Sequence, residues 1–260
     1  MTRVAPAGLD AMARTLREAK ELSYSWLEAK PGDRLLDVGC GPATDTLALA
    51  RLVAPDGRVD GVDLDPAMVE EAERRAAAAG LADRVSHRVA PAAELPFDDG
   101  RFAASRSERL FQHLDDPAAA LAEMVRVTRP GGRVVVADTD HGLTFVDAGE
   151  PEVAELVDRL LALRAQGLAN GRSGRRLWGL CRRAGLADLE VRVLPLVFTR
   201  LAEATAAADL GKAAGAAVSR GVLDAAEAAR LRASLEAADA AGTFFGGGVL
   251  VLVAGRVPAP

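Results

Sequence analysis

The chain has 260 residues, 50% hydrophobic and 27% charged, so it is long and apolar enough to bury a core. Its formal net charge of −5 supplies no basic field for phosphates, which argues against a nucleic-acid partner. Its two cysteines, Cys40 and Cys181, provide neither a disulfide framework nor metal spacing, so a reducing cytoplasm and no metal are expected. The first residues lack a signal-peptide core, and GVLVLVAG (248–255) is too short to span a membrane, so no membrane association is expected.

Predicted helices and strands alternate through the first half of the chain. Apolar residues at helical spacing predict an N-terminal helix, or a pair of helices, over residues 9–29. Turn signals such as PGD (31–33), APDGR (54–58) and RPGG (129–132) separate the elements that follow. The predicted strands are 34–38, 59–64, 84–90, 102–107 and 133–138, and the predicted helices are 44–53, 66–80 and 115–128. This alternation predicts a mainly parallel sheet with helices on both faces and a ligand site at the carboxyl ends of the strands.

The second half of the chain is mostly helical. Helices are predicted at 150–169 and 171–186 and through the alanine-rich stretch 200–241, and strands at 188–199 and 247–257. No internal repeat or low-complexity linker divides the chain, so residues 1–260 are expected to form one domain. Within it we expect an N-terminal helical cap (1–30), a ligand-binding core (31–140), and helical insertions (141–185 and 200–242) that form a lid.

The segment LLDVGCGPATD (35–45) joins the first strand of the core to a helix through a loop with little side-chain bulk. Such a loop offers backbone N–H groups and a helix N-terminus to a polar ligand. A dinucleotide site requires G-x-G-x-x-G, and here Thr44 stands at the sixth position, so that pattern fails. The pattern acid-x-Gly-x-Gly-x-Gly is matched by Asp37, Gly39 and Gly41, with Ala43 in the place of the third glycine.

Over residues 30–140 the sequence resembles the class I S-adenosylmethionine (SAM)-dependent methyltransferases, and is closest to the small-molecule branch that includes the ubiquinone/menaquinone methyltransferases (methyltransferase domain type 11). The glycine loop corresponds to their motif I. Four further stretches in the same order carry the resemblance: GVDLDPAMVEEA (61–72), AELPF (93–97), LFQHLDDPAAALAEMVRV (110–127) and TRPGGRVVVAD (128–138).

The resemblance implies a Rossmann-like, doubly wound α/β fold. Its sheet would have seven strands, mainly parallel, with an antiparallel last strand. The implied activity is transfer of a methyl group from SAM to an O, N or C atom of a small organic molecule by in-line displacement, which leaves S-adenosylhomocysteine.

The resemblance also assigns residues to the cofactor. The methionine end would meet the glycine loop and the end of the fourth strand, at Asp37, Gly39, Cys40, Gly41, Arg106 and Ser107. Asp63, at the end of the second strand, would accept both ribose hydroxyls in charge-assisted hydrogen bonds. The remaining candidates, for the adenosine, are Leu64, Met68, the backbone N–H of Ala92, and Glu94, since the family's adenine-binding carboxylate is replaced by Pro91. Core packing is an equal alternative for Met68, and a solvated turn acid is one for Glu94.

The candidate catalytic residues are two of the three histidines. His113 and His141 follow the fourth and fifth strands, where a base or an acceptor contact would lie, whereas His87 is expected to be structural. Asp138 or Asp140 could orient either imidazole. Glu108 and Arg109 are expected to form an ion pair, and Tyr24 and Trp178 are candidates for lining the acceptor pocket.

Three other functions stay open at this point. A nicotinamide-dependent oxidoreductase could use a similar sheet, although Thr44 and the PGG turn (130–132) count against it. A non-catalytic SAM-fold binding protein would explain the missing adenine carboxylate. A SAM-dependent enzyme that promotes cyclisation is not excluded by any residue. The acceptor is expected to be a small molecule, and a homodimer through the helical insertions is possible.

Overall fold

The structure of the chain is a computed structural model that describes residues 16–208 and 210–259. Its centre is one sheet, in which the order β3-β2-β1-β4-β5 is parallel throughout. These five strands are β1 (Arg34–Val38), β2 (Arg58–Asp63), β3 (Val85–Val89), β4 (Phe102–Glu108) and β5 (Thr128–Thr139). They confirm the predicted mainly parallel α/β fold.

The last strand, β8 (Gly246–Arg256), runs antiparallel to β5, as the resemblance implies. Its other edge pairs with β7 (Ala187–Phe198), also antiparallel. The described residues contain an eighth strand, β6 (Phe145–Val146), that was not predicted. It pairs with the start of β8 and so continues the edge occupied by β5. A strand of two residues is too short to show the alternating pattern from which a strand is predicted.

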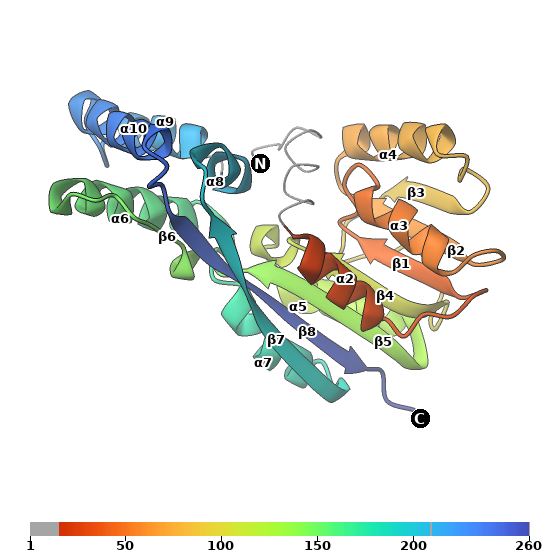
Figure 1. Cartoon of the computed structure of the whole chain (residues 1–260). Coiled ribbons are helices and arrows are strands. Elements are labelled where there is room, and N and C mark those ends of the chain that lie inside the picture. The colour runs from red at the N-terminus through yellow and green to blue at the C-terminus, as the bar shows by residue number, and fades with distance from the viewer. Residues whose placement is uncertain (1–15, 209, 260) are drawn as a thin grey trace.

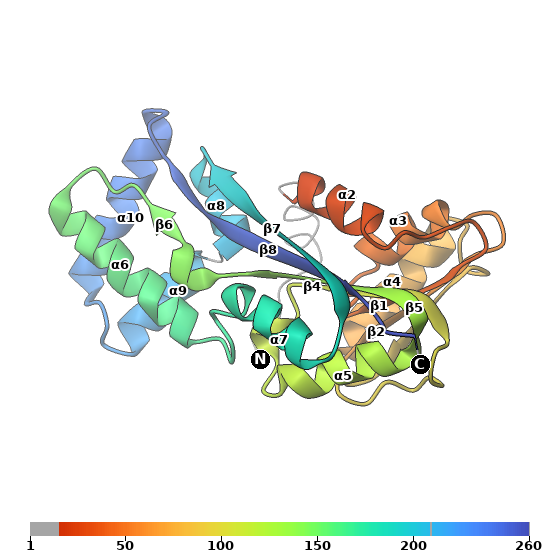
Figure 2. The ribbon, with the colours of Figure 1, turned by 90° about the horizontal axis from the view of Figure 1, so that it is seen from below.

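Helices cover both faces of the sheet (Figures 1 and 2). On one face lie α2 (Arg17–Ser25), α3 (Thr44–Leu52) and α4 (Pro66–Ala78), and on the other lie α5 (Pro117–Val127) and α7 (Leu177–Arg183). The strands alternate accordingly: in β1, Leu35 packs with the α3 side and Leu36 with the α5 side, and both are fully buried. The parallel strands therefore end at one edge, where the site is expected.

A further group of helices lies beyond the start of β8 (Figure 1). It contains α6 (Pro151–Gln166), α8 (Leu201–Ala208), α9 (Leu210–Ser219) and α10 (Ala225–Ala240). Leu156 of α6 and Leu231 of α10 belong to one buried apolar cluster with Leu250 of β8 and Leu16. This cluster attaches the second half of the chain to the sheet.

The boundaries of several elements differ from the predictions. The predicted helix 9–29 lies partly outside the described residues, and its described part is α2. The helix predicted at 171–186 is shorter, because η3 (Gly174–Arg176) precedes α7. The described part of the stretch 200–241 is helical, as predicted, and is divided into α8, α9 and α10. β5 begins at Thr128, so the predicted turn 129–132 belongs to the strand, because Gly131 and Gly132 exchange backbone hydrogen bonds with Val257.

Candidate active site

The glycine loop between β1 and α3 is held open by its backbone conformation. Gly39, Gly41 and Ala43 have φ values of 78°, 52° and 69°, a region that glycine enters without steric cost and alanine does not. The N–H of Gly39 donates to the carbonyl of Val62 at 2.8 Å. A Cβ at Gly39 would lie 3.1 Å from Leu110 Cβ, so the loop is packed tightly against the segment after β4.

Cys40 contributes backbone rather than a thiol to this loop. Its side chain is 5% exposed, and a Cβ at Gly61 of β2 would lie 3.0 Å from its Sγ, so the thiol points into the sheet. Burial raises the pKa of the thiol well above its usual value, and Asp37 and Asp63 raise it further. The thiol therefore stays protonated and unreactive.

Asp63 lies where the resemblance expects it and holds the glycine loop directly. Its Oδ2 accepts from the N–H of Gly41 at 2.9 Å, and its Oδ1 accepts from the N–H of Asp65 at 2.9 Å. Each oxygen keeps a second lone pair, so the carboxylate can still accept from a ligand. Beside it, Leu64 is 56% exposed and Met68 is half-buried in the first turn of α4, so both are accessible.

The segment after β3 runs beside this carboxylate. The N–H of Ala90 donates to the carbonyl of Asp63 at 3.0 Å, which joins the start of the segment to the end of β2. Ala92 is half-buried and Glu94 is exposed, in a turn closed by the bond from Glu94 N–H to the Pro91 carbonyl. The structure thus brings these two candidates to the Asp63 edge of the sheet.

A buried group of charges lies behind the glycine loop. Arg106 of β4 is 1% exposed, and its guanidinium contacts Asp37 at 3.3 Å, Asp45 at 3.2 Å and Glu108 at 2.8 Å. Lys20 of α2 contacts Asp45 at 2.8 Å and Glu108 at 2.7 Å. The expected pair of Glu108 with Arg109 is therefore wrong as a direct ion pair, because Glu108 binds Lys20 and Arg106.

Asp37 is the member of this group with an open position. It is 2% exposed, and its Oδ2 is buried without a hydrogen-bond partner. Burial raises the pKa of the Asp37 carboxyl, while Arg106 opposes the shift. An unpartnered buried carboxylate oxygen is costly, so its place beside the glycine loop indicates a site for a cationic or hydrogen-bond-donating ligand group. Ser107 follows Arg106 in β4, and its buried Oγ also lacks a hydrogen-bond partner.

Tyr24 of α2 belongs to the charge group as well. Its hydroxyl donates to Asp45, and the guanidinium of Arg106 lies 5.2 Å from its ring centroid. Burial and the neighbouring Asp45 raise the pKa of the phenol far above its usual value, so the hydroxyl stays a donor. Tyr24 thus anchors α2 to α3. Its contacts are with this charge group, and none of them places it in an acceptor pocket as expected.

The candidate histidines lie in two short 3₁₀ helices, η1 (Phe111–His113) and η2 (His141–Leu143), which follow β4 and β5. His141 Nε2 lies 2.6 Å from Gln112 Oε1, and Gln112 Nε2 lies 3.0 Å from His113 Nε2. The guanidinium of Arg164, in α6, contacts His141 Nδ1. The structure therefore joins both histidines through Gln112, which sequence reasoning missed although it precedes His113 directly.

Neither candidate aspartate orients an imidazole, which corrects that expectation. Asp138 accepts from the backbone N–H groups of Gln112 at 2.7 Å and Thr139 at 2.8 Å, and so positions η1. Asp140 accepts from the N–H of Gly142 at 3.0 Å and from the guanidinium of Arg175. The imidazoles are oriented by amide and guanidinium groups instead. His87 lies between Thr46 and Glu73, in the structural role that was predicted.

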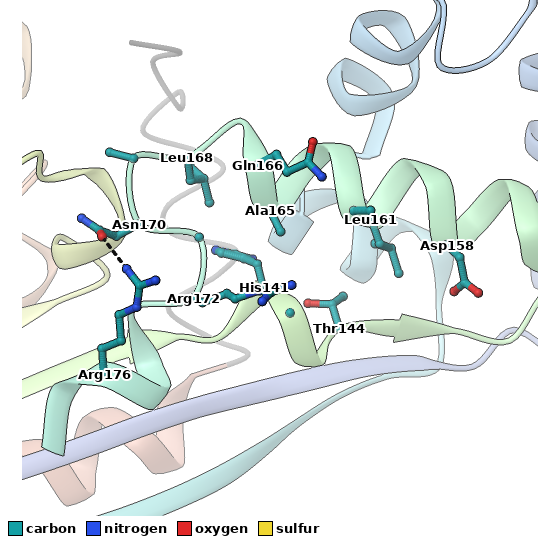
Figure 3. A pocket seen from close by; sticks show the side chains of 14 residues that line it. His141, Thr144, Asp158, Leu161, Ala165, Gln166, Leu168, Asn170, Arg172 and Arg176 are labelled. Atoms are coloured by element: carbon teal, nitrogen blue, oxygen red, sulfur yellow. Dashed lines mark hydrogen bonds between the residues drawn. The ribbon is translucent and has the colours of Figure 1, made fainter. Parts of the chain in front are cut away.

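A cavity of about 460 Å³ opens beside His141 (Figure 3). Its wall is built by η2, by the C-terminal half of α6 and by residues 168–172, which precede η3. Arg172 and Arg176 line it together with Asp158, and Figure 3 shows Arg172 next to His141. Trp178 does not line this cavity and is 44% exposed on α7, so the structure does not support its assignment to the acceptor pocket.

Two absences hold for the described ranges 16–208 and 210–259. Within them, no group of three or more His, Cys, Asp or Glu side chains is arranged to hold a metal ion. Within the same ranges, none of the helices combines the length and the apolar character that crossing a membrane requires.

Comparisons with known proteins identify similar sequences. Residues 35–132 match the family described as "Methyltransferase domain". The chain is 37% identical over 247 residues to an uncharacterised 37.1 kDa protein in transposon TN4556 of Streptomyces fradiae. This match covers 94% of this chain and 69% of that protein. It is 39% identical over 106 residues to a demethylmenaquinone methyltransferase of Symbiobacterium thermophilum. That match covers 41% of this chain and 42% of the relative, so the chain spans less than half of the relative's length.

Solved structures match over nearly the whole chain. The YcgJ protein of Bacillus subtilis has a TM-score of 0.66 at 20% identity, covering 94% of this chain and 100% of that chain. A [4+2]-cyclase, SpnF, has a TM-score of 0.59 at 23% identity, covering 93% of this chain and 81% of that chain. At these identities the structures establish the fold alone. The sequence matches show that residues 35–132 belong to the methyltransferase domain family.

Proposed function

We propose that the chain binds SAM and transfers its methyl group to a small organic acceptor. The observation that carries this proposal is the unpartnered Oδ2 of Asp37, buried beside a loop that Asp63 holds open. An ammonium group at the loop, bound directly or through water, would supply the missing partner. The free lone pairs of Asp63 suit two vicinal hydroxyls, so the residues present fit both ends of the cofactor.

SAM supplies an electrophilic methyl group, and the residues of this chain bind and orient the reactants. The glycine loop and Asp63 would fix the cofactor's position at the ends of β1 and β2. The cavity beside His141 is the proposed acceptor site, because it opens between η2 and α6 and is lined by this candidate catalytic histidine. Holding the acceptor atom in line with the methyl group is the main contribution of such a site.

The division of labour along the chain is part of the same proposal. Residues 1–30 would cap the site, residues 31–140 would bind the cofactor, and residues 141–185 and 200–242 would form the acceptor lid. The support is that α6 lines the cavity while α2 is bound to the core through Lys20. The buried free thiols of Cys40 and Cys181 support a cytoplasmic location.

The similarity to a demethylmenaquinone methyltransferase favours methyl transfer over a nicotinamide-dependent oxidoreductase. A second candidate function is SAM-dependent cyclisation, because a [4+2]-cyclase has the same fold. The two differ in cofactor use, since methyl transfer converts SAM to S-adenosylhomocysteine and a cyclisation leaves the methyl group in place.

The first experiment is calorimetric titration with S-adenosylhomocysteine, with NADH as the control ligand. Micromolar binding of S-adenosylhomocysteine alone supports the proposed cofactor, and acceptor screening with labelled SAM then follows. Binding of NADH alone would support the oxidoreductase. Binding of neither would leave a non-catalytic member of the family as the better interpretation.

A further inference from the structure

Four side chains form a continuous row of hydrogen bonds from α6 to η1. They are Arg164, His141, Gln112 and His113. Each junction needs one donor and one acceptor, so the identity of the end groups determines which ring nitrogen of each histidine carries a proton.

The α6 end of the row has only one possible direction. A guanidinium donates and cannot accept, so His141 Nδ1, which contacts Arg164, must be unprotonated. The proton of the neutral ring is then on Nε2, which donates to Gln112 Oε1 at 2.6 Å. Burial and the charges of Arg164 and Arg109 lower the pKa of His141 to about 2, so the ring is neutral at physiological pH.

The η1 end is fixed by a separate contact. Gln112 Nε2 donates to the backbone carbonyl of Arg109 at 3.1 Å, and a carbonyl only accepts. This bond fixes which atom of the Gln112 amide is nitrogen and which is oxygen, independently of the contact with Arg164. It leaves Gln112 Oε1 facing His141 as an acceptor, in agreement with the proton on His141 Nε2. The same Nε2 faces His113 Nε2 at 3.0 Å, so His113 Nε2 must be the acceptor.

The remaining nitrogen of His113 therefore carries the proton. Partial desolvation and the charges of Arg109 and Arg164 lower the pKa of His113, which is exposed at one side, so its ring is neutral and has one N–H, at Nδ1. An imidazole in this state presents a donor to its surroundings, and its one basic nitrogen is occupied by Gln112. It cannot take a proton from an acceptor molecule without breaking the row.

We propose that Gln112 is a positioning residue that holds His113 in the Nδ1–H tautomer, so that this imidazole offers a hydrogen-bond donor and does not act as a base. A methyl acceptor that contacts His113 would then present an atom that accepts this hydrogen bond. The positive charges of Arg109 and Arg164, which both act on His113, would favour an anionic oxygen there, as in a carboxylate, a phenolate or an enolate. This substrate class rests on the proposed function, whereas the tautomer is a property of the chain itself.

The tautomers are measured by ¹⁵N NMR of the full chain labelled at histidine. The chain has three histidines, so single replacements assign every ring. We expect opposite tautomers, with the proton on Nδ1 of His113 and on Nε2 of His141. A proton on Nε2 of His113 in the unmodified chain would overturn the proposal.

Two variants of Gln112 test its positioning role. Gln112→Glu places an acceptor-only group against His113 Nε2, so we expect the His113 proton to move to Nε2. Gln112→Leu removes the contact, so a mixture of His113 tautomers is expected while His141 keeps its proton on Nε2. His87 reports whether the fold survives, because its Nδ1 contacts Glu73 and stays protonated in a folded chain. An unchanged His113 in both folded variants would overturn the role of Gln112.

The acceptor class is tested on the same signals with S-adenosylhomocysteine present. Benzoate is the anionic probe and benzyl alcohol is its neutral match. We expect a saturable shift of the His113 Nδ1 signal with benzoate only. Equal shifts with both probes, or a shift with neither, would overturn the anionic class. A chain that fails to bind S-adenosylhomocysteine in calorimetry overturns the proposed function, and the tautomer result on the free chain is unaffected.

Discussion

The guanidinium of Arg106 lies 3.3 Å from the carboxylate of Asp37, and the two side chains are 1% and 2% exposed. The pair joins β4 to β1 directly behind the glycine loop. Arg106 and Lys20 are the two cations of a group that also contains Asp45 and Glu108. Buried ions are tolerated only when they are paired, so the arrangement of α2, β1 and β4 depends on these contacts being complete.

Replacing Arg106 by methionine should therefore destabilise the fold strongly. Arg106→Met leaves Lys20 alone against three buried carboxylates, and breaking a buried pair costs about 3–5 kcal/mol. Urea unfolding measures the loss of free energy. The control is Arg182→Met, on an exposed position of α7, where a change within about 0.5 kcal/mol is expected. Equal stability of the two variants would show that the Arg106 contacts are not needed.

Asp138 should make stability depend on pH. Burial raises its pKa to about 7, against hydrogen bonds from Gln112 and Thr139, whereas an unfolded aspartate titrates at about 3.9. Between these values the folded chain holds a proton that the unfolded chain has lost, so stability falls as pH rises from about 4 to about 7.

The matched variant for this measurement is Asp138→Asn, which cannot titrate. We expect the free energy of unfolding of the unmodified chain, relative to the variant, to be larger at about pH 5 than at about pH 8. Urea unfolding of both proteins across this range gives the difference. A difference independent of pH would contradict the raised pKa.

The fold was predictable because its signals are local. Asp65 and Asp116 cap α4 and α5 by accepting from N–H groups in the first turn, and each precedes a proline. The apolar run between two such signals predicted a strand at 34–38, and β1 has these bounds. The start of β5 was not predictable, because Gly131 and Gly132 make their backbone hydrogen bonds with Val257, far away in the sequence.

The candidate site divides in the same way. Asp63 and the glycine loop were predicted because a strand end and a loop carry their own sequence pattern. Gln112 was missed, since its contact with His141, and that of His141 with Arg164, exist only after β5 and α6 have packed beside η1. Arg106 was predicted to lie at the methionine end of the cofactor, and only the packing of α2 against β4 reveals the contacts of its side chain.

Asp63→Ala should weaken binding of S-adenosylhomocysteine by about tenfold or more. The variant removes the carboxylate that we propose accepts hydrogen bonds from the two ribose hydroxyls of the cofactor. A tenfold change in the dissociation constant equals about 1.4 kcal/mol of binding free energy. It also releases the N–H of Gly41, which adds to the effect. Calorimetry measures the dissociation constant, with Asp56→Ala, in an exposed turn, as the control. Unchanged affinity would remove Asp63 from the cofactor site.

Gly39→Ala should reduce both stability and cofactor affinity. Its φ of +78° costs an alanine about 1–2 kcal/mol, and the new Cβ would lie 3.1 Å from Leu110. Gly80→Ala is the matched control, because Gly80 has a φ of +67° and open space around it, so only the backbone cost applies. Urea unfolding should therefore show a larger loss for Gly39→Ala.

Affinity separates the two glycine variants further. Gly80 follows α4 outside the glycine loop, so Gly80→Ala should bind S-adenosylhomocysteine as the unmodified chain does. Gly39→Ala moves Leu110 or the loop itself, and we expect its dissociation constant to rise because the backbone can no longer lie in the same place. If both variants lose stability equally and bind equally well, the close contact between Gly39 and Leu110 has no role in shaping the site.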